Sequence, residues 1–147
     1  MKAGDGAREY SAGGYRRAAR LLLVSGGPAP ALAAVVLARR HRGWFEARAV
    51  AVRPGPAGVQ ARVALRAAGV ALPLRPVRRI SRAALAWADL VLTLDDAARG
   101  RVAAMVPRRP SRHVAVPYAP DWAGWCRQVE RRLAGMAGGM RMLAQSR

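Results

Sequence analysis

The stretch Arg20–Leu32, RLLLVSGGPAPAL, decides the fold of this chain. Its first part, 21–24, is a short run of apolar residues without polar alternation, which is typical of a strand buried on both faces of a parallel sheet. The glycines and prolines that follow predict a turn, and the apolar residues of 31–41 then predict a helix. The stretch therefore predicts the first strand–turn–helix unit of an α/β sheet.

The same alternation of strand and helix repeats along the rest of the chain. Further strands are expected at 44–52, 90–94 and 113–116, and helices at 58–68, 82–88, 97–105 and 122–133. Because no hairpin signal separates the strands, we expect a doubly wound, three-layer α/β sandwich with a four-stranded parallel sheet. Ligands of such sheets bind beyond the carboxyl ends of the strands, so segments 25–31, 93–96 and 117–121 are expected on one rim.

The length of 147 residues suits one domain, which we place at 20–134. Residues 1–19 are Gly-rich and basic and predict a flexible arm, while 135–147 predict a Gly/Met-rich tail. A secretory signal of twin-arginine character is an alternative for the first part of the chain, because Arg16 and Arg17 precede an apolar stretch. A Gly/Pro insert interrupts that stretch, and no segment is apolar for long enough to span a membrane, so we expect a cytoplasmic protein.

The cysteine and histidine content excludes several classes of site. Cys126 is the only cysteine, which rules out a disulfide framework and favours a packed, free thiol. Only His41 and His113 carry imidazoles, so we expect no metal site and no cofactor.

The chain is strongly basic, with 26 Lys and Arg against 8 Asp and Glu and a formal net charge of +18. A preference for Arg over Lys fits a GC-rich genome, but it does not explain the excess of cations. The excess favours an acidic protein or another polyanion, such as nucleic acid, as a partner. Because the arginines are spread from Arg8 to Arg147, a diffuse solvated surface is the alternative.

Four segments occur in an order that resembles a known family. The chain reads VSGGPAPAL at 24–32, GVAL at 69–72 and ADLVLTL at 88–94, and Asp121 precedes the last helix in a Pro-rich loop. These segments resemble the low-molecular-weight protein tyrosine phosphatases and the thioredoxin-linked arsenate reductases that share their fold. The phosphate loop of that family reads Val-Cys-x-Gly-Asn-x-x-Arg-Ser, and its general acid is similar in placement to Asp121.

The resemblance implies a phosphate loop that lacks the family's catalytic side chains. In the family, a thiolate attacks phosphorus and the loop arginine holds the transferring group. Here Ser25 and Ala31 stand at those two positions, and Pro28 and Pro30 each remove a backbone N–H donor. The resemblance therefore implies a catalytically degenerate domain that acts as a binding or regulatory module. Such a domain is expected not to hydrolyse an aryl phosphate or reduce arsenate. The expected binding loop comprises Ser25, Gly26, Gly27, Pro28, Ala29, Pro30 and Ala31.

An active enzyme with a loop rebuilt around Ser25 is the alternative hypothesis. It would be a phosphatase-type hydrolase, and it requires a replacement for the missing arginine, for which the candidates are Arg53, Arg78 and Arg79. Ser25 and Asp121 are then the vestigial catalytic candidates, although a turn hydroxyl and a helix N-cap explain them more simply.

The two acids after the third predicted strand also allow two interpretations. Asp95 and Asp96 are expected on the rim, where they can form an acid/base pair. Acids at this position more often cap the following helix and interact with its positive end.

Overall fold

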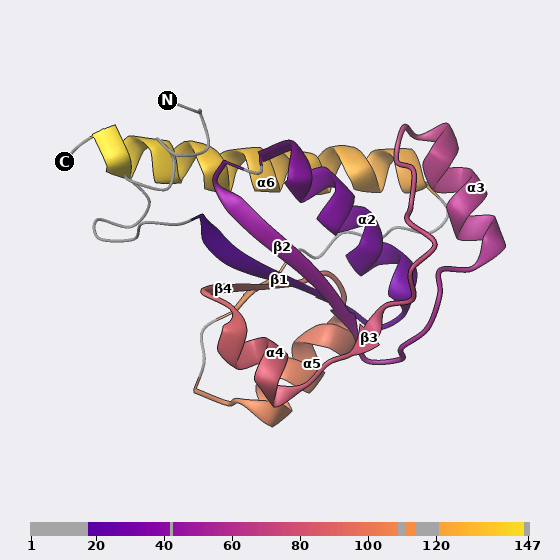
Figure 1. Ribbon diagram of the computed structural model, residues 1–147, viewed down its shortest axis with the longest axis horizontal. Helices are drawn as coiled ribbons and strands as arrows, with labels where there is room; N and C mark the ends of the chain where they lie inside the picture. The colour runs from indigo at the N-terminus through magenta and orange to yellow at the C-terminus, as the bar shows by residue number, and fades with distance from the viewer. Residues whose placement is uncertain (1–17, 42, 109–110, 114–120, 146–147) are drawn as a thin grey trace.

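The computed structural model describes residues 18–41, 43–108, 111–113 and 121–145, with side chains as far as residue 140. In this part of the chain, five parallel strands form one sheet in the order β3-β2-β1-β4-β5 (Figure 1). The strands are β1 (Ala19–Ser25), β2 (Phe45–Ala51), β3 (Arg78–Arg79), β4 (Leu90–Thr93) and β5 (Arg112–His113). The doubly wound α/β fold is confirmed, with one strand more than expected.

Helices cover both faces of this sheet. Figure 1 shows α2, α3 and α6 on one face and α4 and α5 on the other. The helices are α2 (Pro28–Ala38), α3 (Val59–Ala67), α4 (Arg82–Trp87), α5 (Asp96–Met105) and α6 (Trp122–Gln145), with a 3₁₀ turn η2 (Arg39–His41) after α2. The three layers match the expected sandwich.

The central strand β1 explains why the sequence of 21–24 is apolar without alternation. Leu21 and Leu23 pack in the cluster beneath α2 and α6, whereas Leu22 and Val24 pack in the cluster beneath α4 and α5. All four side chains have no exposed surface. The strand is therefore buried on both faces, as its sequence predicts.

The extra strand β3 had no sequence signal. It consists of two exposed arginines, Arg78 and Arg79, which pair in parallel with Val50 and Ala51 at the edge of the sheet. A two-residue strand with no buried side chain leaves no apolar pattern to read, and four strands were therefore expected.

Helix α2 begins three residues earlier than expected. Pro28 occupies the first helical position and Pro30 lies in the first turn, where the backbone N–H groups have no partner within the helix. Proline is therefore tolerated there, and its fixed φ suits the helix. The expected start at Ala31 was wrong because the two prolines were assigned to the turn.

Helix α6 extends to Gln145, although a helix end near Leu133 and a Gly/Met-rich tail over 135–147 were expected. Beyond Leu133, Ala137 is fully buried, and Met136 and Met140 pack against the same core cluster. Burial of this apolar face outweighs the cost of about 1 kcal/mol for each of the glycines at 135, 138 and 139.

Two expected helix ends are confirmed. The Ser81 hydroxyl accepts a hydrogen bond of 3.1 Å from the Ala84 N–H at the start of α4. Gly69 follows α3 with a φ of +88°, and Val70 N–H donates to the Leu65 carbonyl. Gly69 can take this left-handed conformation because it has no Cβ.

Three expectations fall on residues outside the described part of the chain. They are residues 1–17 of the arm expected at 1–19, the strand residues 114–116 and the rim segment 117–120. The last two residues of the expected arm, Ala18 and Ala19, are buried, and Ala19 is the first residue of β1. Within the described part, every helix is too short or too polar to span a lipid bilayer.

Candidate functional site

The loop after β1 lies where ligands of doubly wound sheets bind. β1 has β2 on one side and β4 on the other: the chain leaves β1 toward β2 through α2, and it reaches β4 later, from β3 through α4. The loop therefore follows the carboxyl end of the central strand at the topological switch point. We take Ser25–Ala31, together with the residues that touch it, as the candidate site.

The Ser25 hydroxyl both donates and accepts a hydrogen bond within this loop. It donates a hydrogen bond of 2.5 Å to the Gly27 carbonyl and accepts one of 3.0 Å from the Ala31 N–H. Ser25 has no exposed surface. The hydroxyl is therefore a bridge between the end of β1 and the first turn of α2, as expected for a turn hydroxyl.

Neither histidine serves Ser25 as a base. His41 Nε2 lies 2.9 Å from Glu130 Oε1, and His113 Nδ1 lies 2.8 Å from Thr93 Oγ1. A hydroxyl becomes an effective nucleophile only with a base in hydrogen-bond reach. In the described residues, the partners of the Ser25 hydroxyl are the two backbone groups above.

Few backbone donors of the loop remain for an anion. Pro28 and Pro30 have no N–H, and the Ala31 N–H is bonded to Ser25. The Gly26 N–H donates to Asp95 Oδ2 over 2.8 Å. The N–H groups of Gly27 and Ala29 are the remaining donors of 25–31 that an anion can use, which is fewer than a phosphate-binding loop normally offers.

Asp95 joins the loop to the far side of the sheet. Its Oδ2 accepts from Gly26, and its Oδ1 accepts a 2.9 Å hydrogen bond from the Ala98 N–H at the start of α5. The expected N-cap is thus confirmed, and the carboxylate also lies directly on the loop. A negative charge at this position disfavours a bound phosphate.

Asp96 does not form a pair with Asp95. Its side chain is 91% exposed, and Oδ1 lies 4.0 Å from Arg99 Nη2 and 3.5 Å from His113 Nε2. The two neighbouring acids therefore point in different directions, so the acid/base pair considered above is not assembled.

Of the three arginines considered as replacements, the structure brings Arg53 to the loop. Arg53 Nη2 lies 3.5 Å from the position of a Cβ built on Gly26 and 3.6 Å from one built on Gly27. The Arg53 N–H also donates to the Gly26 carbonyl. Arg78 and Arg79 are exposed on the edge strand β3.

Asp121 is exposed at the start of α6. Its Oδ1 accepts a 2.9 Å hydrogen bond from the Gly124 N–H, and its carbonyl accepts from the Trp125 N–H. The carboxylate thus acts as the N-cap of α6, which was the simpler of the two interpretations.

Cys126 is buried in the core cluster that joins α2 and α6. Burial raises the pKa of its thiol, and the nearby charges of Arg40 and Arg127 offset part of that rise. The thiol is therefore the packed side chain that was expected. Among the described residues, no group of three or more His, Cys, Asp or Glu side chains is arranged to hold a metal ion.

Comparison with solved structures shows what this architecture is. YwlE arginine phosphatase from Geobacillus stearothermophilus matches with a TM-score of 0.64 and 17% identity, over 84% of this chain and 94% of that one. The low-molecular-weight protein tyrosine phosphatase from T. tengcongensis matches with a TM-score of 0.56 and 19% identity, over 82% and 96%. The chain has the fold of the low-molecular-weight protein tyrosine phosphatases.

A third match is a structure whose active site contains a serine. It is a mutant of YwlE arginine phosphatase with a phosphorylated active-site serine, with a TM-score of 0.56 and 19% identity over 86% of this chain and 94% of that one. No protein-family model matches the sequence, and neither does any curated protein. The phosphatase fold therefore rests on structure and on the order of motifs.

The sequence placed Asp95 on the rim of the phosphatase-fold loop and named Arg53 among three candidate arginines, but it did not predict their contacts with the two glycines. Asp95 was expected to cap a helix, but its bond to Gly26 joins residues 69 positions apart and depends on β1 and β4 being neighbours. The position of Arg53 next to the two glycines depends on the pairing of β1 with β2 in the same way. Only the strand order, which periodicity does not give, reveals either contact.

Proposed function

We propose that this chain is a catalytically degenerate phosphatase-fold domain that acts as a binding or regulatory module. The observation that carries the proposal is the state of Ser25, whose hydroxyl is buried and bonded to Gly27 and Ala31. An attacking hydroxyl has to be free to approach phosphorus and to lose its proton to a base. Ser25 meets neither requirement.

The surroundings of Ser25 support the same conclusion. Phosphoryl transfer depends on positive charge and N–H donors around the equatorial oxygens, and loss of such an arginine costs several powers of ten in rate. Here Ala31 carries no charge, two loop residues are prolines, and the carboxylate of Asp95 accepts from Gly26. The loop has little left with which to stabilise a transition state.

Turnover assays test the proposal. The purified chain is tested with an aryl phosphate, with arsenate and a thiol reductant, and with phosphoarginine, because some solved structures with this fold are arginine phosphatases. We expect no rate above that of Ser25→Ala with any of the three. Turnover that disappears on changing Ser25 or Asp121 to Ala would contradict the proposal.

One observation favours a second candidate function, a phosphatase-type enzyme with its loop rebuilt around Ser25. Arg53 Nη2 lies next to Gly26 and Gly27, where a guanidinium can reach an anion above the loop. In the serine mutant of YwlE, a serine carries the phosphoryl group. This candidate predicts turnover that is lost in Arg53→Gln and retained in Arg79→Gln, since Arg79 lies on the edge strand.

A further inference from the structure

The most exposed large apolar side chains of the described residues lie close together in sequence. Val59 is 76% exposed, Val63 is 65% exposed and Leu74 is 85% exposed. Two of them belong to α3 and the third to the segment that follows it. Burial in the fold therefore does not explain why these positions are apolar.

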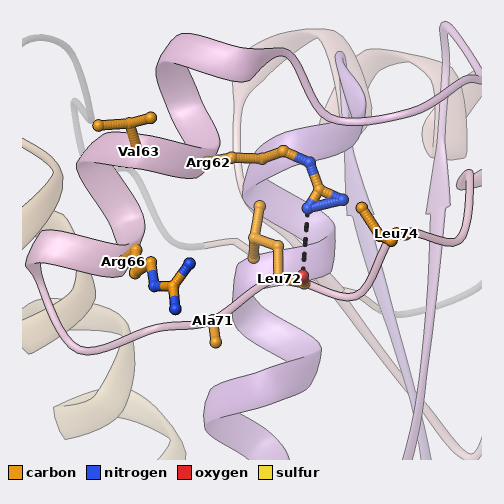
Figure 2. Close-up of a pocket in the computed structure, with 6 residues that line it drawn as sticks. All are labelled: Arg62, Val63, Arg66, Ala71, Leu72 and Leu74. Carbon is orange, nitrogen blue, oxygen red and sulfur yellow. Dashed lines mark hydrogen bonds between the residues drawn. The ribbon is translucent and has the colours of Figure 1, made fainter.

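Two of these side chains border an open groove. The groove lies between α3 and the segment 71–74 and has a cavity volume of about 200 Å³. Figure 2 shows that its lining comes from one face of α3 and from the extended segment opposite. The lining residues are Arg62, Val63, Arg66, Ala71, Leu72 and Leu74.

The groove is held in shape by the protein itself. Arg62 Nη1 donates to the Leu72 carbonyl over 3.1 Å and Nη2 donates to the Pro73 carbonyl over 2.8 Å (Figure 2 shows the first). Leu72 also packs against the core cluster beneath it. Both walls are therefore fixed before anything binds, which lowers the entropic cost of binding.

The charged side chains that line the groove, Arg62 and Arg66, are both arginines. Between Glu46 and Asp89 the sequence contains eight arginines and no Asp or Glu. Arg66 lines the groove with an exposed side chain, and Arg75 is exposed just beyond Leu74. An occupant with carboxylates is attracted here and meets no carboxylate within the lining.

We propose that this groove binds an acidic segment of another protein, with an apolar side chain between Val63 and Leu74 and a carboxylate on Arg66. A second copy of the chain is disfavoured, because it brings the same excess of positive charge to the interface. Nucleic acid would satisfy the arginines and leave the apolar side chains without a partner. The proposal concerns a surface separate from the loop, so it stands or fails independently of the catalytic state of the chain.

Binding of a defined peptide tests the proposal on the full chain. The probe is a short synthetic peptide with a pair of Leu residues flanked by Glu, and its control has Ser in place of both Leu. We expect the Leu peptide to bind more tightly than the Ser peptide at matched ionic strength. Val63→Ala and Leu74→Ala should each weaken the Leu peptide about three- to tenfold, the effect of losing a few buried methyl groups.

Val59→Ala is the matched control, because Val59 is on the same helix, is also largely exposed and does not line the groove. It should leave the affinity unchanged. Arg66→Gln should weaken binding more than Arg82→Gln, which removes an exposed arginine from α4 on the other face of the sheet. Equal effects of Val59→Ala and Val63→Ala, or equal binding of the two peptides, would overturn the proposal.

Two further experiments test for other occupants of the groove. Sedimentation velocity over a range of concentrations detects self-association, and its loss in Leu74→Ala would assign the groove to a second copy. An RNA oligonucleotide whose binding is weakened by Val63→Ala and not by Val59→Ala would assign it to nucleic acid. Either result overturns the proposal, whereas RNA binding that is unaffected by both variants supports it.

Discussion

The Ser25 side chain contributes to folding through its two hydrogen bonds, to the Gly27 carbonyl and from the Ala31 N–H. Ser25→Ala leaves the buried Ala31 N–H and the Gly27 carbonyl without that partner. We expect the free energy of unfolding to fall by about 1 to 3 kcal/mol, the cost of leaving a buried polar group unsatisfied. Denaturant unfolding measures this, with Ser81→Ala as the control, because the Ser81 cap is exposed. A loss no larger than that of Ser81→Ala would contradict the assigned role.

Cys126 gives a pH dependence whose direction follows from burial. Burial raises the pKa of the folded thiol above 9.0, so the folded chain holds this proton more tightly than the unfolded chain. The resulting stability is fully present below pH 9.0 and is lost as the pH rises through the folded pKa. Compared with Cys126→Ala, the unmodified chain should therefore lose stability above that pH. Parallel stability curves for the two proteins would contradict the assignment.

At the scale of the elements, two aspartates cap helices but contribute differently to the free energy of unfolding. Asp95 caps α5 and also accepts the Gly26 N–H from the loop after β1, whereas Asp121 caps α6 at an exposed position. Asp95→Ala should lower the free energy of unfolding by about 2 kcal/mol, the sum of a lost cap and a lost tertiary hydrogen bond. Asp121→Ala should cost less. Thermal unfolding compares them, and an equal loss would show that the bond to Gly26 contributes nothing.

Most elements were predictable because their cause is local. The apolar run of β1, the Ser81 cap and the positive φ of Gly69 each depend on neighbouring residues. The end of α6 was not predictable, because its glycines oppose a helix and the packing against α2 that favours one lies far away in the sequence.

The candidate site divides in the same way. The loop Ser25–Ala31, and the absence from it of the cysteine and the arginine of the phosphatase loop, were evident from its residue types alone. Asp95 was expected on the same rim and Arg53 was one of three candidates, but their specific contacts with that loop were not evident, since both arise from strands that become neighbours only in the folded sheet. A sequence shows which groups a loop lacks more readily than it shows which groups from other strands contact that loop in the folded protein.

At the scale of the molecule, several arginines have partners other than carboxylates. Arg62 bonds to the carbonyls of Leu72 and Pro73, and Arg132 bonds to that of His113. The Arg48 guanidinium lies 4.2 Å from the centre of the Trp87 ring, which is a cation–π contact. These contacts orient arginines without neutralising them, so the net charge of +18 stays available to partners.

We expect this charge to bind nucleic acid weakly and without sequence preference. The exposed arginines are spread over many elements, so phosphate contacts rather than base contacts should dominate. Affinity for a DNA duplex should then fall steeply between low and physiological salt, and two unrelated sequences should bind alike. Gel retardation at two salt concentrations measures both effects. Unchanged mobility at low salt would show that the charge is only solvated.

The central claim is that the loop after β1 no longer holds an oxyanion. The most direct test is the melting temperature of the chain in phosphate, compared with chloride at matched ionic strength so that screening of the +18 charge cancels. With two prolines in the loop and Asp95 bonded to Gly26, we predict the same melting temperature in both salts. A rise specific to phosphate that Gly27→Val abolishes would contradict the claim, since a Cβ at Gly27 meets only Arg53, at 3.6 Å, and should leave the fold intact.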